Sequence, residues 1–535
     1  MARRKLLFLL AFVTVISQLS HAAAFNILAI VSVPLKSHYM AFQMLFRELA
    51  IRGHSVTVIN NYPDVNPPPN LKFVNISTHG PNTFPHMTEF EQSEYASFYK
   101  FQNLLKHIVV GGKRAVMDCE NLFTNENMKQ FRAKGENFDV IFVEQFMSDC
   151  GLVFAALYDA PIIGITSHTL LPWAYARLGL PFDFGSEAFY FSDAGTNPSL
   201  LNKIQSYIAN LFFTTLGELN IYQNIYKVFD MYVPNNKLNV DTIAKEKMKM
   251  MFVYQHHSVT GARLMAPSVL EIAGIHIQTP KPVPKDIEKF IDSANHGVIY
   301  VSFGSNLKMS TMSSKKLQQF LDAFKKIPQK VLWKIENSTL IAGNENVFGS
   351  NWFPQLDVLC HPNVLAFVSH GGMLSLSEAA HCGKPLLTIP FFGDQFSNSA
   401  AVRESGLGTM MYFQDVTADT LSEAIRELTS PKMQANAKRV SKLWHDRPQN
   451  VMDSAIYWTE YVARHGDAPA ALPSTRTTWF QRSLLDVYSV LLGILFAILA
   501  LAYLIFRKIK LILGSLLNLF STRTKSKSKD KKKRS

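Results

Sequence analysis

The segment of residues 367–400, FVSHGGMLSLSEAAHCGKPLLTIPFFGDQFSNSA, constrains the fold of this chain more than any other part of the sequence. An apolar run is followed by a tight turn at His370, Gly371 and Gly372, and then by a helical stretch. A second apolar run follows at residues 385–390. This order of strand, glycine-rich turn, helix and strand predicts a βαβ unit of an α/β protein, with the turn at the carboxyl end of a buried strand.

The polar residues of this segment have the types and spacing that a nucleotide-sugar requires. Glycines at a strand end let the backbone approach phosphate, and the free amides of the following helix point at it. Glu378 on that helix can accept hydrogen bonds from two ribose hydroxyls, and Asp394 with Gln395 at the next strand end can bind the hydroxyls of a sugar. The segment therefore predicts a site for a nucleotide that carries a sugar.

These residues resemble the signature of the family-1 glycosyltransferases, specifically the animal UDP-glycosyltransferases. The resemblance covers His370-Gly371-Gly372, Glu378, Gly383, Pro385, Ile389-Pro390 and Asp394-Gln395, and upstream Trp352, Pro354-Gln355, Asp357, Leu359 and His361-Pro362. One departure is Met373-Leu374, because many relatives have Thr-Asn there and present polar side chains to the donor. The insect-like run Phe392-Gly393-Asp394-Gln395 favours glucose over glucuronate or galactose as the sugar.

The resemblance implies the GT-B fold, an α/β architecture of two facing Rossmann-like domains, here with a C-terminal transmembrane helix. It implies inverting transfer of a hexose from a UDP-sugar to a hydroxyl of a small lipophilic acceptor, in detoxification or hormone conjugation. The UDP-sugar is a co-substrate, and no other cofactor is expected. The chain has no Asp-x-Asp, the motif with which other transferases bind a divalent ion. We therefore expect no metal, and a departing UDP stabilised by amides, His370 and a helix dipole.

Three further residues are expected to contact the donor. Ser305 follows an apolar run and resembles the family's other contact to the diphosphate. Trp352 and Gln355 fit uracil, because an indole ring can stack on the base while an amide can hydrogen-bond to it.

The transfer also needs a base for the acceptor hydroxyl, and a neutral histidine suits this role because its unperturbed pKa lies near 6.5. The chain has 16 histidines, so position must choose among them. His38 follows the first apolar run, where α/β folds place active sites, and Ser37-His38 resembles the catalytic position of the family. Glu144 or Asp149 is expected to orient it, and the sequence leaves both open.

Three other histidines, His54, His168 and His381, are expected to be structural rather than catalytic. A non-catalytic, membrane-anchored protein that binds lipophiles with the same fold is the alternative function, and the presence of both His38 and the Asp394-Gln395 pair disfavours it.

The charge distribution indicates a membrane protein rather than a nucleic-acid-binding one. The formal net charge is +13, but residues 507–535 hold eleven Lys or Arg and one acidic residue, and Arg3, Arg4 and Lys5 add three more positive charges. The body between these ends is therefore near neutral. Residues 487–506 are free of charge and long enough to span a bilayer, and their basic C-terminal flank predicts a cytosolic tail.

The termini and the composition predict an endoplasmic-reticulum membrane protein of type I with a luminal body. Residues 1–24 have the basic start, short apolar core and small-residue end of a signal peptide. Lys532 and Lys533 resemble a dilysine retrieval signal. Asn75 and Asn337 begin glycosylation sequons. Cys119, Cys150, Cys360 and Cys382 fit no zinc template and allow three disulfide pairings, with free thiols as the alternative.

Apolar runs that alternate with helical stretches recur in two modules. The first opens with a strand at residues 25–33 and a helix that Ser37 could cap, and residues 180–260 read as a helical insertion at the acceptor pocket that also touches the membrane. Residues 449–465 are expected to cross back to the first module. The expected domains are a signal peptide at 1–24, an acceptor-binding domain at 25–279, a linker at 280–296, a UDP-sugar-binding domain at 297–465, a juxtamembrane segment at 466–486, a transmembrane helix at 487–506 and a basic tail at 507–535. Association into a homo-oligomer is compatible with this organisation.

Overall fold

The computed structural model describes residues 24–77, 86–91, 112–146, 148–189, 192–233, 239–466 and 477–532. The chain divides into two compact units, residues 1–472 and residues 473–535. Residues 1–23 of the expected signal peptide and Lys533 of the dilysine pair lie outside the described residues.

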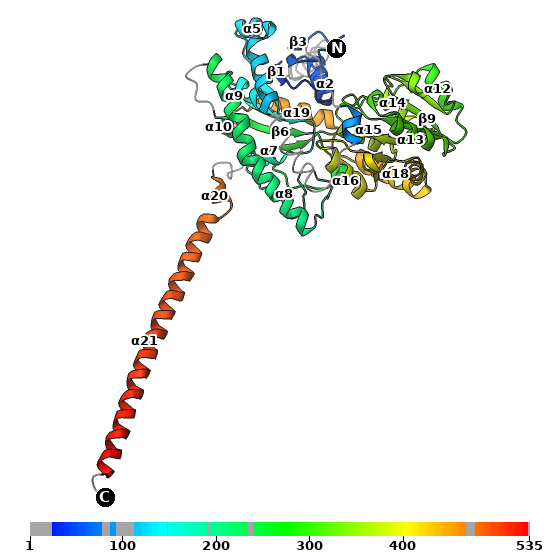
Figure 1. The fold of residues 1–535 in the computed structure, drawn as a ribbon. Coiled ribbons are helices and arrows are strands. Elements are labelled where there is room, and N and C mark those ends of the chain that lie inside the picture. Colours follow the sequence, from blue (N-terminus) through cyan, green and yellow to red (C-terminus); the bar gives the residue numbers. More distant parts are fainter. Residues whose placement is uncertain are drawn as a thin grey trace, which may run out of the picture. The chain divides into compact units, whose positions relative to one another are not determined.

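The first unit contains two parallel sheets, which confirms the predicted α/β class (Figure 1). The first sheet has the order β3-β2-β1-β4-β5-β6-β7 and the second has the order β10-β9-β8-β11-β12-β13. The strands of the first sheet are β1 (Asn26–Val31), β2 (Ser55–Asn60), β3 (Leu71–Asn75), β4 (Val140–Glu144), β5 (Ile162–Thr166), β6 (Met248–Val253) and β7 (Val269–Glu271). Those of the second are β8 (Val298–Ser302), β9 (Lys330–Lys334), β10 (Val347–Ser350), β11 (Val364–Ser369), β12 (Leu386–Thr388) and β13 (Gly408–Met410).

Helices cover both faces of each sheet, so the central strands are buried on both sides and read as unbroken apolar runs. Around the first sheet lie α2 (Lys36–Ile51), a helix at residues 112–124, α5 (Glu126–Ala133), α6 (Cys150–Ala155), α7 (Pro172–Arg177), α8 (Leu200–Phe212), a π-helical turn η1 (Phe213–Gly217), α9 (Glu218–Tyr232), α10 (Val240–Lys247), α11 (His257–Thr260) and α19 (Val451–Arg464). Around the second lie α3 (Met87–Glu91), α12 (Lys285–Asp292), α13 (Ser314–Lys325), α14 (Gln355–Cys360), α15 (Met373–Cys382), α16 (Gln395–Ser405), α17 (Ala418–Leu428) and α18 (Pro431–His445), with 3₁₀ turns η2 (Met309–Thr311), η3 (Ser338–Ile341) and η4 (Phe413–Asp415).

Both sheets reverse their strand order at one place, and this place is where ligands bind in doubly wound folds. In the first sheet the reversal lies between β1 and β4, which pair in parallel with Ile30 opposite Val143. In the second it lies between β8 and β11, which pair with Ser302 opposite Ser369. The loops that leave these four strands are therefore the positions from which side chains can reach a ligand.

The structure corrects the sequence analysis at several elements. The N-cap of α2 is Leu35, which makes no side-chain hydrogen bond, so Ser37 lies inside the first turn and does not cap the helix. Residues 180–260 are not helical throughout, because β6 occupies Met248–Val253. The short strands β10 and β13 were not predicted from the sequence. Residues 280–296 include α12, whose Ile287 and Ile291 are buried in the core.

The two halves of the first unit face each other and also pack together through a common apolar cluster. One apolar cluster runs from Phe42 of α2 through Ile287 of α12 to Tyr300 of β8. In addition, α3 packs on the second half, where the amide of Met87 donates to Thr311 Oγ1 at 2.9 Å.

The last helix of the unit, α19, returns to the first sheet as predicted. Asp453 Oδ1 accepts a hydrogen bond of 2.5 Å from Arg52 Nη2, and Glu460 Oε1 lies 3.3 Å from His54 Nε2. The Nδ1 atom of His54 accepts from the amide of Phe25. His54 therefore joins the start of β1 to α19, which is the structural position expected for it.

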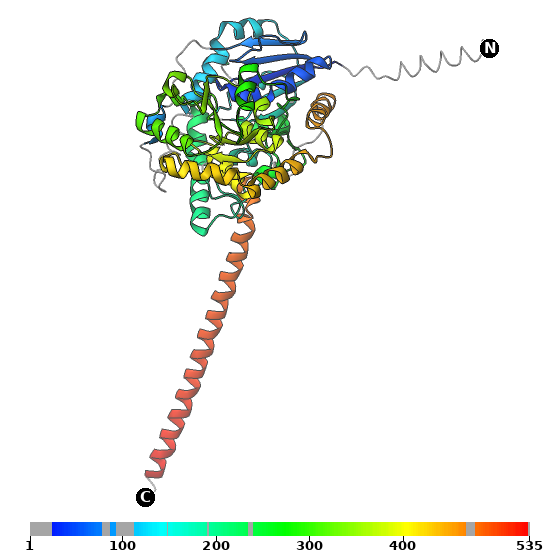
Figure 2. The same ribbon diagram turned by 90° about the vertical axis from the view of Figure 1, so that its right-hand side faces the viewer.

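The second unit contains α20 (Trp479–Arg482) and α21 (Leu485–Lys532), a single continuous helix (Figures 1 and 2). Its segment Leu485–Asn518 is a candidate membrane span, with a mean hydropathy of 2.7 over its most apolar window of 18 residues. The uncharged stretch predicted from the sequence, residues 487–506, lies inside it. A helix of this length and composition is compatible with the predicted transmembrane anchor.

Two disulfides pair the four cysteines, which resolves the three alternatives that the sequence allows. Cys119 bonds to Cys150, and Cys360 bonds to Cys382. The first joins the helix at residues 112–124 to the start of α6, and the second joins the last residues of α14 and α15.

We expect the bond between Cys360 and Cys382 to stabilise the second sheet and its helices. The two residues are 22 positions apart. Closing a loop of this size should raise the free energy of unfolding by about 3 kcal/mol. The Cys360→Ser/Cys382→Ser variant should therefore melt at a lower temperature, measured by thermal unfolding in detergent. A reductant should lower the melting temperature of the wild type further than that of this variant, and equal shifts would contradict the expectation.

Candidate active site

The first switch point brings His38 and Glu144 together. His38 lies in the first turn of α2, directly after β1, and Glu144 is the last residue of β4. His38 Nδ1 lies 2.5 Å from Glu144 Oε1, and the two residues are 5% and 4% exposed. A carboxylate at Nδ1 requires a proton on that nitrogen, so the neutral imidazole presents Nε2 as an acceptor. Such an imidazole can take a proton from a bound hydroxyl.

Aromatic rings surround the imidazole of His38. The ring of Phe146 lies 4.5 Å away and that of His168 lies 4.9 Å away, centroid to centroid. Burial, followed by the charge of His38, lowers the pKa of His168 well below its usual value. Because His168 is neutral, it adds no second positive charge beside His38 when His38 is protonated. The sequence analysis expected His168 to be structural, and the structure places it beside the candidate base.

Of the two candidate carboxylates, Asp149 does not contact His38. It forms a bidentate ion pair with Arg177 of α7, with Nη1 to Oδ1 at 2.9 Å and Nη2 to Oδ2 at 2.6 Å. Arg177 also donates to Gln145 at 2.7 Å and to Tyr222 at 2.8 Å. Gln145 directly follows Glu144, so this buried ion pair fixes the start of the loop that leaves β4 next to Glu144.

The second switch point has the features of an anion site. Gly304, after β8, and Gly371, after β11, both have positive φ angles, of 78° and 85°. A Cβ atom at Gly304 would lie 2.8 Å from the ring of His370, so only glycine lets the two strand ends approach this closely. The amides at the start of α15 and the exposed Ser305 complete this end of the sheet.

Burial lowers the pKa of His370 to about 4, and the nearby charge of Lys334 acts in the same direction. His370 is therefore a neutral hydrogen-bonding group at neutral pH. Lys334 is the cation of this region, and its Nζ donates to the carbonyl of Gly304 at 2.8 Å.

The residues expected to bind uridine lie next to this site. Trp352 is 55% exposed, as a ring that stacks on a base must be before the base arrives. The ammonium groups of Lys36 and Lys334 lie 5.4 Å and 5.2 Å from its ring centroid. Gln355 Nε2 donates to Glu378 Oε2 at 2.5 Å, so the two residues expected to contact the base and the ribose are hydrogen-bonded to each other.

Asp394 and Gln395 differ in how open they are to a ligand. Asp394 precedes α16, accepts from Asn398 Nδ2 at 2.8 Å, and has a pKa raised to about 6 by burial, against the lowering effects of Asn398 and His38. The charge of His38 thus acts on a carboxyl group of the second half. Gln395 is buried, and its Oε1 accepts from the amides of Phe391 and Phe392 at 2.8 and 3.2 Å.

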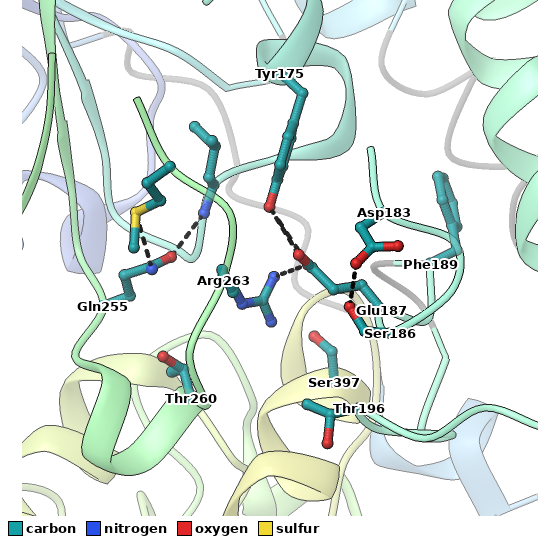
Figure 3. Close-up of polar contacts among 12 residues, drawn as sticks. Tyr175, Asp183, Ser186, Glu187, Phe189, Thr196, Gln255, Thr260, Arg263 and Ser397 are labelled. Carbon is teal, nitrogen blue, oxygen red and sulfur yellow. Dashed lines mark hydrogen bonds and ion pairs between the residues drawn. The ribbon is translucent and has the colours of Figure 1, made fainter. Parts of the chain in front are cut away.

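A second polar group lies beside α16 on the side of the first sheet (Figure 3). Tyr175 of α7 donates to Glu187 at 3.2 Å, and Arg263 Nη1 donates to Glu187 Oε2 at 2.6 Å. Burial raises the pKa of Glu187 despite the charge of Arg263. In Figure 3 the side chain of Ser397, on α16, lies across from this group, so residues of both halves border the same region.

The structure also brings to the site residues that the sequence analysis did not select. These residues belong to no motif: Lys36, Lys334, Phe146, Arg177 and His276. Lys36 and His276 contact residues of the second half, Trp352 and Glu378, because the two sheets face each other. The sequence offered a signal for one of these residues: Lys36 is a basic residue two positions before His38. Among the described residues, no group of three or more His, Cys, Asp or Glu is placed to bind a metal ion.

Comparison with known proteins identifies the family of the chain. Residues 28–519 match the family model for UDP-glucoronosyl and UDP-glucosyl transferase. A UDP-glycosyltransferase (UGT5) of Dactylopius coccus is 33% identical, over 92% of this chain and 93% of the relative. UDP-glucosyltransferase 2 of the same organism is 31% identical, over 91% and 93%. Mouse UDP-glucuronosyltransferase 2A3 is 26% identical, over 85% and 87%.

Solved structures with similar folds are glycosyltransferases of the GT-B type. The glycotransferase of kitacinnamycin superposes with a TM-score of 0.56 at 18% identity, over 82% of this chain and 99% of that one. The calicheamicin glycosyltransferase CalG4 superposes with a TM-score of 0.52 at 15% identity, over the same shares. The predicted GT-B fold is therefore confirmed, and the chain belongs to the UDP-glycosyltransferase family.

Proposed function

We propose that this protein transfers glucose from UDP-glucose to a hydroxyl of a small lipophilic acceptor, with inversion at the anomeric carbon and without a metal ion. The observation that carries the proposal is the buried pair of His38 and Glu144 at one switch point. The charge of His38 also lowers the pKa of Asp394, so the base lies within electrostatic range of the carboxylate proposed to bind the sugar.

The proposed reaction is a single displacement. His38 Nε2 takes the proton of the acceptor hydroxyl while its oxygen forms a bond to the anomeric carbon. The bond from that carbon to the β-phosphate oxygen breaks, and its electron pair leaves with UDP. Glu144 stabilises the imidazolium that forms, because its carboxylate already accepts from Nδ1 at 2.5 Å. Attack from the side opposite the phosphate inverts the configuration.

The departing diphosphate would be stabilised by fixed groups of the second switch point. The amides at the start of α15, the hydroxyl of Ser305, neutral His370 and the ammonium of Lys334 lie at this end of the sheet. Dipoles that are oriented before the reaction stabilise developing charge without reorganising.

Two observations support a lipophilic acceptor and a neutral sugar. The rings of Phe146 and His168 border His38, which suits an apolar acceptor. The carboxyl of Asp394, whose pKa is raised to about 6, is ionised at neutral pH and would repel the carboxylate of a glucuronate. The proposal of glucose also follows the name of one relative, although another relative is named a glucuronosyltransferase. Detoxification or hormone conjugation is the proposed role.

Removing the base should abolish most of the transfer. We expect His38→Ala to lower kcat/KM for an aliphatic alcohol by roughly 10²–10⁴-fold, as for a lost general base. The affinity for UDP, measured by calorimetry, should change little, because His38 contacts the acceptor side. An acidic phenol should be rescued at high pH more than the alcohol is. Transfer to the alcohol at nearly the wild-type rate would place the base elsewhere.

The two carboxylates supply matched controls for this experiment. Glu144→Gln should lower turnover with little loss of stability, and it should add little in the His38→Ala background because the pair acts as a unit. Asp149→Asn should instead lower the melting temperature, because it breaks a buried ion pair worth roughly 3–5 kcal/mol when one partner is removed.

The sugar-binding role of Asp394 can be tested with Asp394→Asn. This variant should weaken binding of UDP-glucose by about 1–3 kcal/mol and leave UDP affinity unchanged, because UDP has no sugar hydroxyls to contact. In the wild type the preference for UDP-glucose over UDP should fall as the pH drops through about 6, where Asp394 gains its proton. Gln395→Ala should, in contrast, also lower the free energy of unfolding, because two loop amides lose their acceptor. An equal loss of UDP affinity in Asp394→Asn would indicate a structural role.

We also propose that the protein is a type I protein of the endoplasmic reticulum whose catalytic body is luminal. Its two disulfides fit an oxidising lumen, and Asn75 and Asn337 are exposed, as glycan acceptors must be. Helix α8 carries an exposed apolar face of Leu200, Leu201, Ile204, Ile208 and Leu211, which suits the membrane contact expected for residues 180–260.

This topology makes a prediction for sealed microsomes. Added protease should remove only the residues after about 507, because the basic flank of the span faces the cytosol. Digestion with an endoglycosidase should lower the apparent mass of the protected fragment, and Asn75→Gln/Asn337→Gln should remove that change. Loss of the body under these conditions would overturn the proposed orientation.

A further inference from the structure

His276 lies at the junction of the two halves and contacts the carboxylate of Glu378. It belongs to the segment that leads from β7 to α12, and its side chain is 9% exposed. Its Nε2 lies within ion-pair distance of Glu378 Oε1, at 3.5 Å, but makes no hydrogen bond among the described residues, whereas its Nδ1 is hydrogen-bonded to the hydroxyl of Tyr254, which follows β6. The sequence analysis assigned no role to His276.

The partners of this imidazole determine where its hydrogen lies. Glu378 has only acceptor oxygens when ionised, so an attractive contact requires a hydrogen on Nε2 of His276. The neutral ring then accepts at Nδ1, and the hydroxyl of Tyr254 is the donor there. Tyr254 already accepts from the amide of Gly274 at 3.2 Å, and burial raises its pKa, so it keeps its proton. Tyr254 thus selects the tautomer of His276 that has its hydrogen on Nε2, the atom nearest Glu378.

The opposite side of Glu378 is fixed by the second sheet. Its Oε2 accepts from Gln355 Nε2 at 2.5 Å, and Gln355 Oε1 accepts from the hydroxyl of Tyr300, in β8, at 3.3 Å. The carboxylate is therefore oriented from both halves of the unit, through His276 on one side and Gln355 on the other.

The segment that carries His276 is itself tightly packed. A Cβ atom at Gly274 would lie 2.8 Å from the ring of Trp444, and the φ angle there is 87°. Arg447 donates to the carbonyl of Ala273 at 2.9 Å. Because these contacts fix the segment, the side chain of His276 keeps a constant position relative to the first sheet.

We propose that His276 is a positioning residue, which orients Glu378 for the ribose and makes nucleotide affinity depend on the contact between the two halves. The inference rests on the proposed role of Glu378 as the ribose-binding group. When a nucleotide binds, Gln355 can turn to the base, while the contact with His276 keeps the carboxylate directed at the ribose hydroxyls.

The test compares UDP with 2′-deoxy-UDP, because only UDP offers the 2′-hydroxyl to Glu378. Dissociation constants of both nucleotides are measured by calorimetry on the full-length protein in detergent. His276→Ala should weaken UDP by roughly 5- to 30-fold, as for loss of one polar contact to a charged group, and 2′-deoxy-UDP by much less. The preference for UDP should therefore shrink. His276→Gln, whose amide can donate from nearly the same place as Nε2, should restore most of it.

Three further variants separate the outcomes. Tyr254→Phe, which keeps the buried ring, should reduce the preference for UDP in the same direction, and it gives the answer if His276→Ala fails to fold. His445→Gln, in an exposed histidine of α18, should leave the preference unchanged. In the Glu378→Ala background, His276→Ala should cause no further change in the preference.

An equal loss of affinity for both nucleotides in His276→Ala and Tyr254→Phe would overturn the proposal and indicate general destabilisation. An undiminished preference in both variants would also overturn it. If Glu378→Ala keeps the full preference for UDP, the ribose-binding role of Glu378 is wrong, which is a different result from a failure of His276 alone.

Discussion

The strand order of the two parallel sheets is the constraint on which the rest of the structure depends. Each sheet reverses its direction of growth once, and at that point the loops leaving neighbouring strands diverge to opposite faces and open a crevice. In the first sheet the crevice contains His38 and Glu144, and in the second it contains Gly304 and His370. The location of the chemistry is therefore a consequence of topology, before any residue type is considered.

Burial then decides what each of these groups can do. It lowers the pKa values of His168 and His370, so both are neutral, and it raises the pKa of Asp394 to about 6. Glu144 contacts His38 rather than a cation, whereas Asp149 is paired with Arg177. The two carboxylates are five residues apart, and the ion pair of Asp149 leaves Glu144 as the one available to an imidazole. Local pairing, rather than residue type, assigns them different roles.

The sequence was sufficient for the fold class and for the motifs that follow strands, because long apolar runs and glycine turns are local signals. It predicted that an apolar strand ends just before His370, as β11 does, and that His38 follows the first strand of the chain. Short edge strands such as β10 and β13, with three or four residues, carry too little pattern to detect. It could not choose between Glu144 and Asp149, nor select Lys36 or His276, because these depend on contacts between residues more than a hundred positions apart or between the two halves.

The contacts of Glu378 also bear on how the nucleotide binds. Gln355 and Glu378 share a hydrogen bond of 2.5 Å, so uridine must exchange this bond for its own contacts to the base and ribose. The exchange conserves the number of hydrogen bonds, and its net cost is small if the carboxylate does not move. The contact of Glu378 with His276 is the one that can persist through that exchange, since it lies on the other carboxylate oxygen. His276 can hold the carboxylate of Glu378 in position while Gln355 releases it to the nucleotide. The carboxylate then binds ribose without first losing its position, which lowers the entropic cost of ordering it.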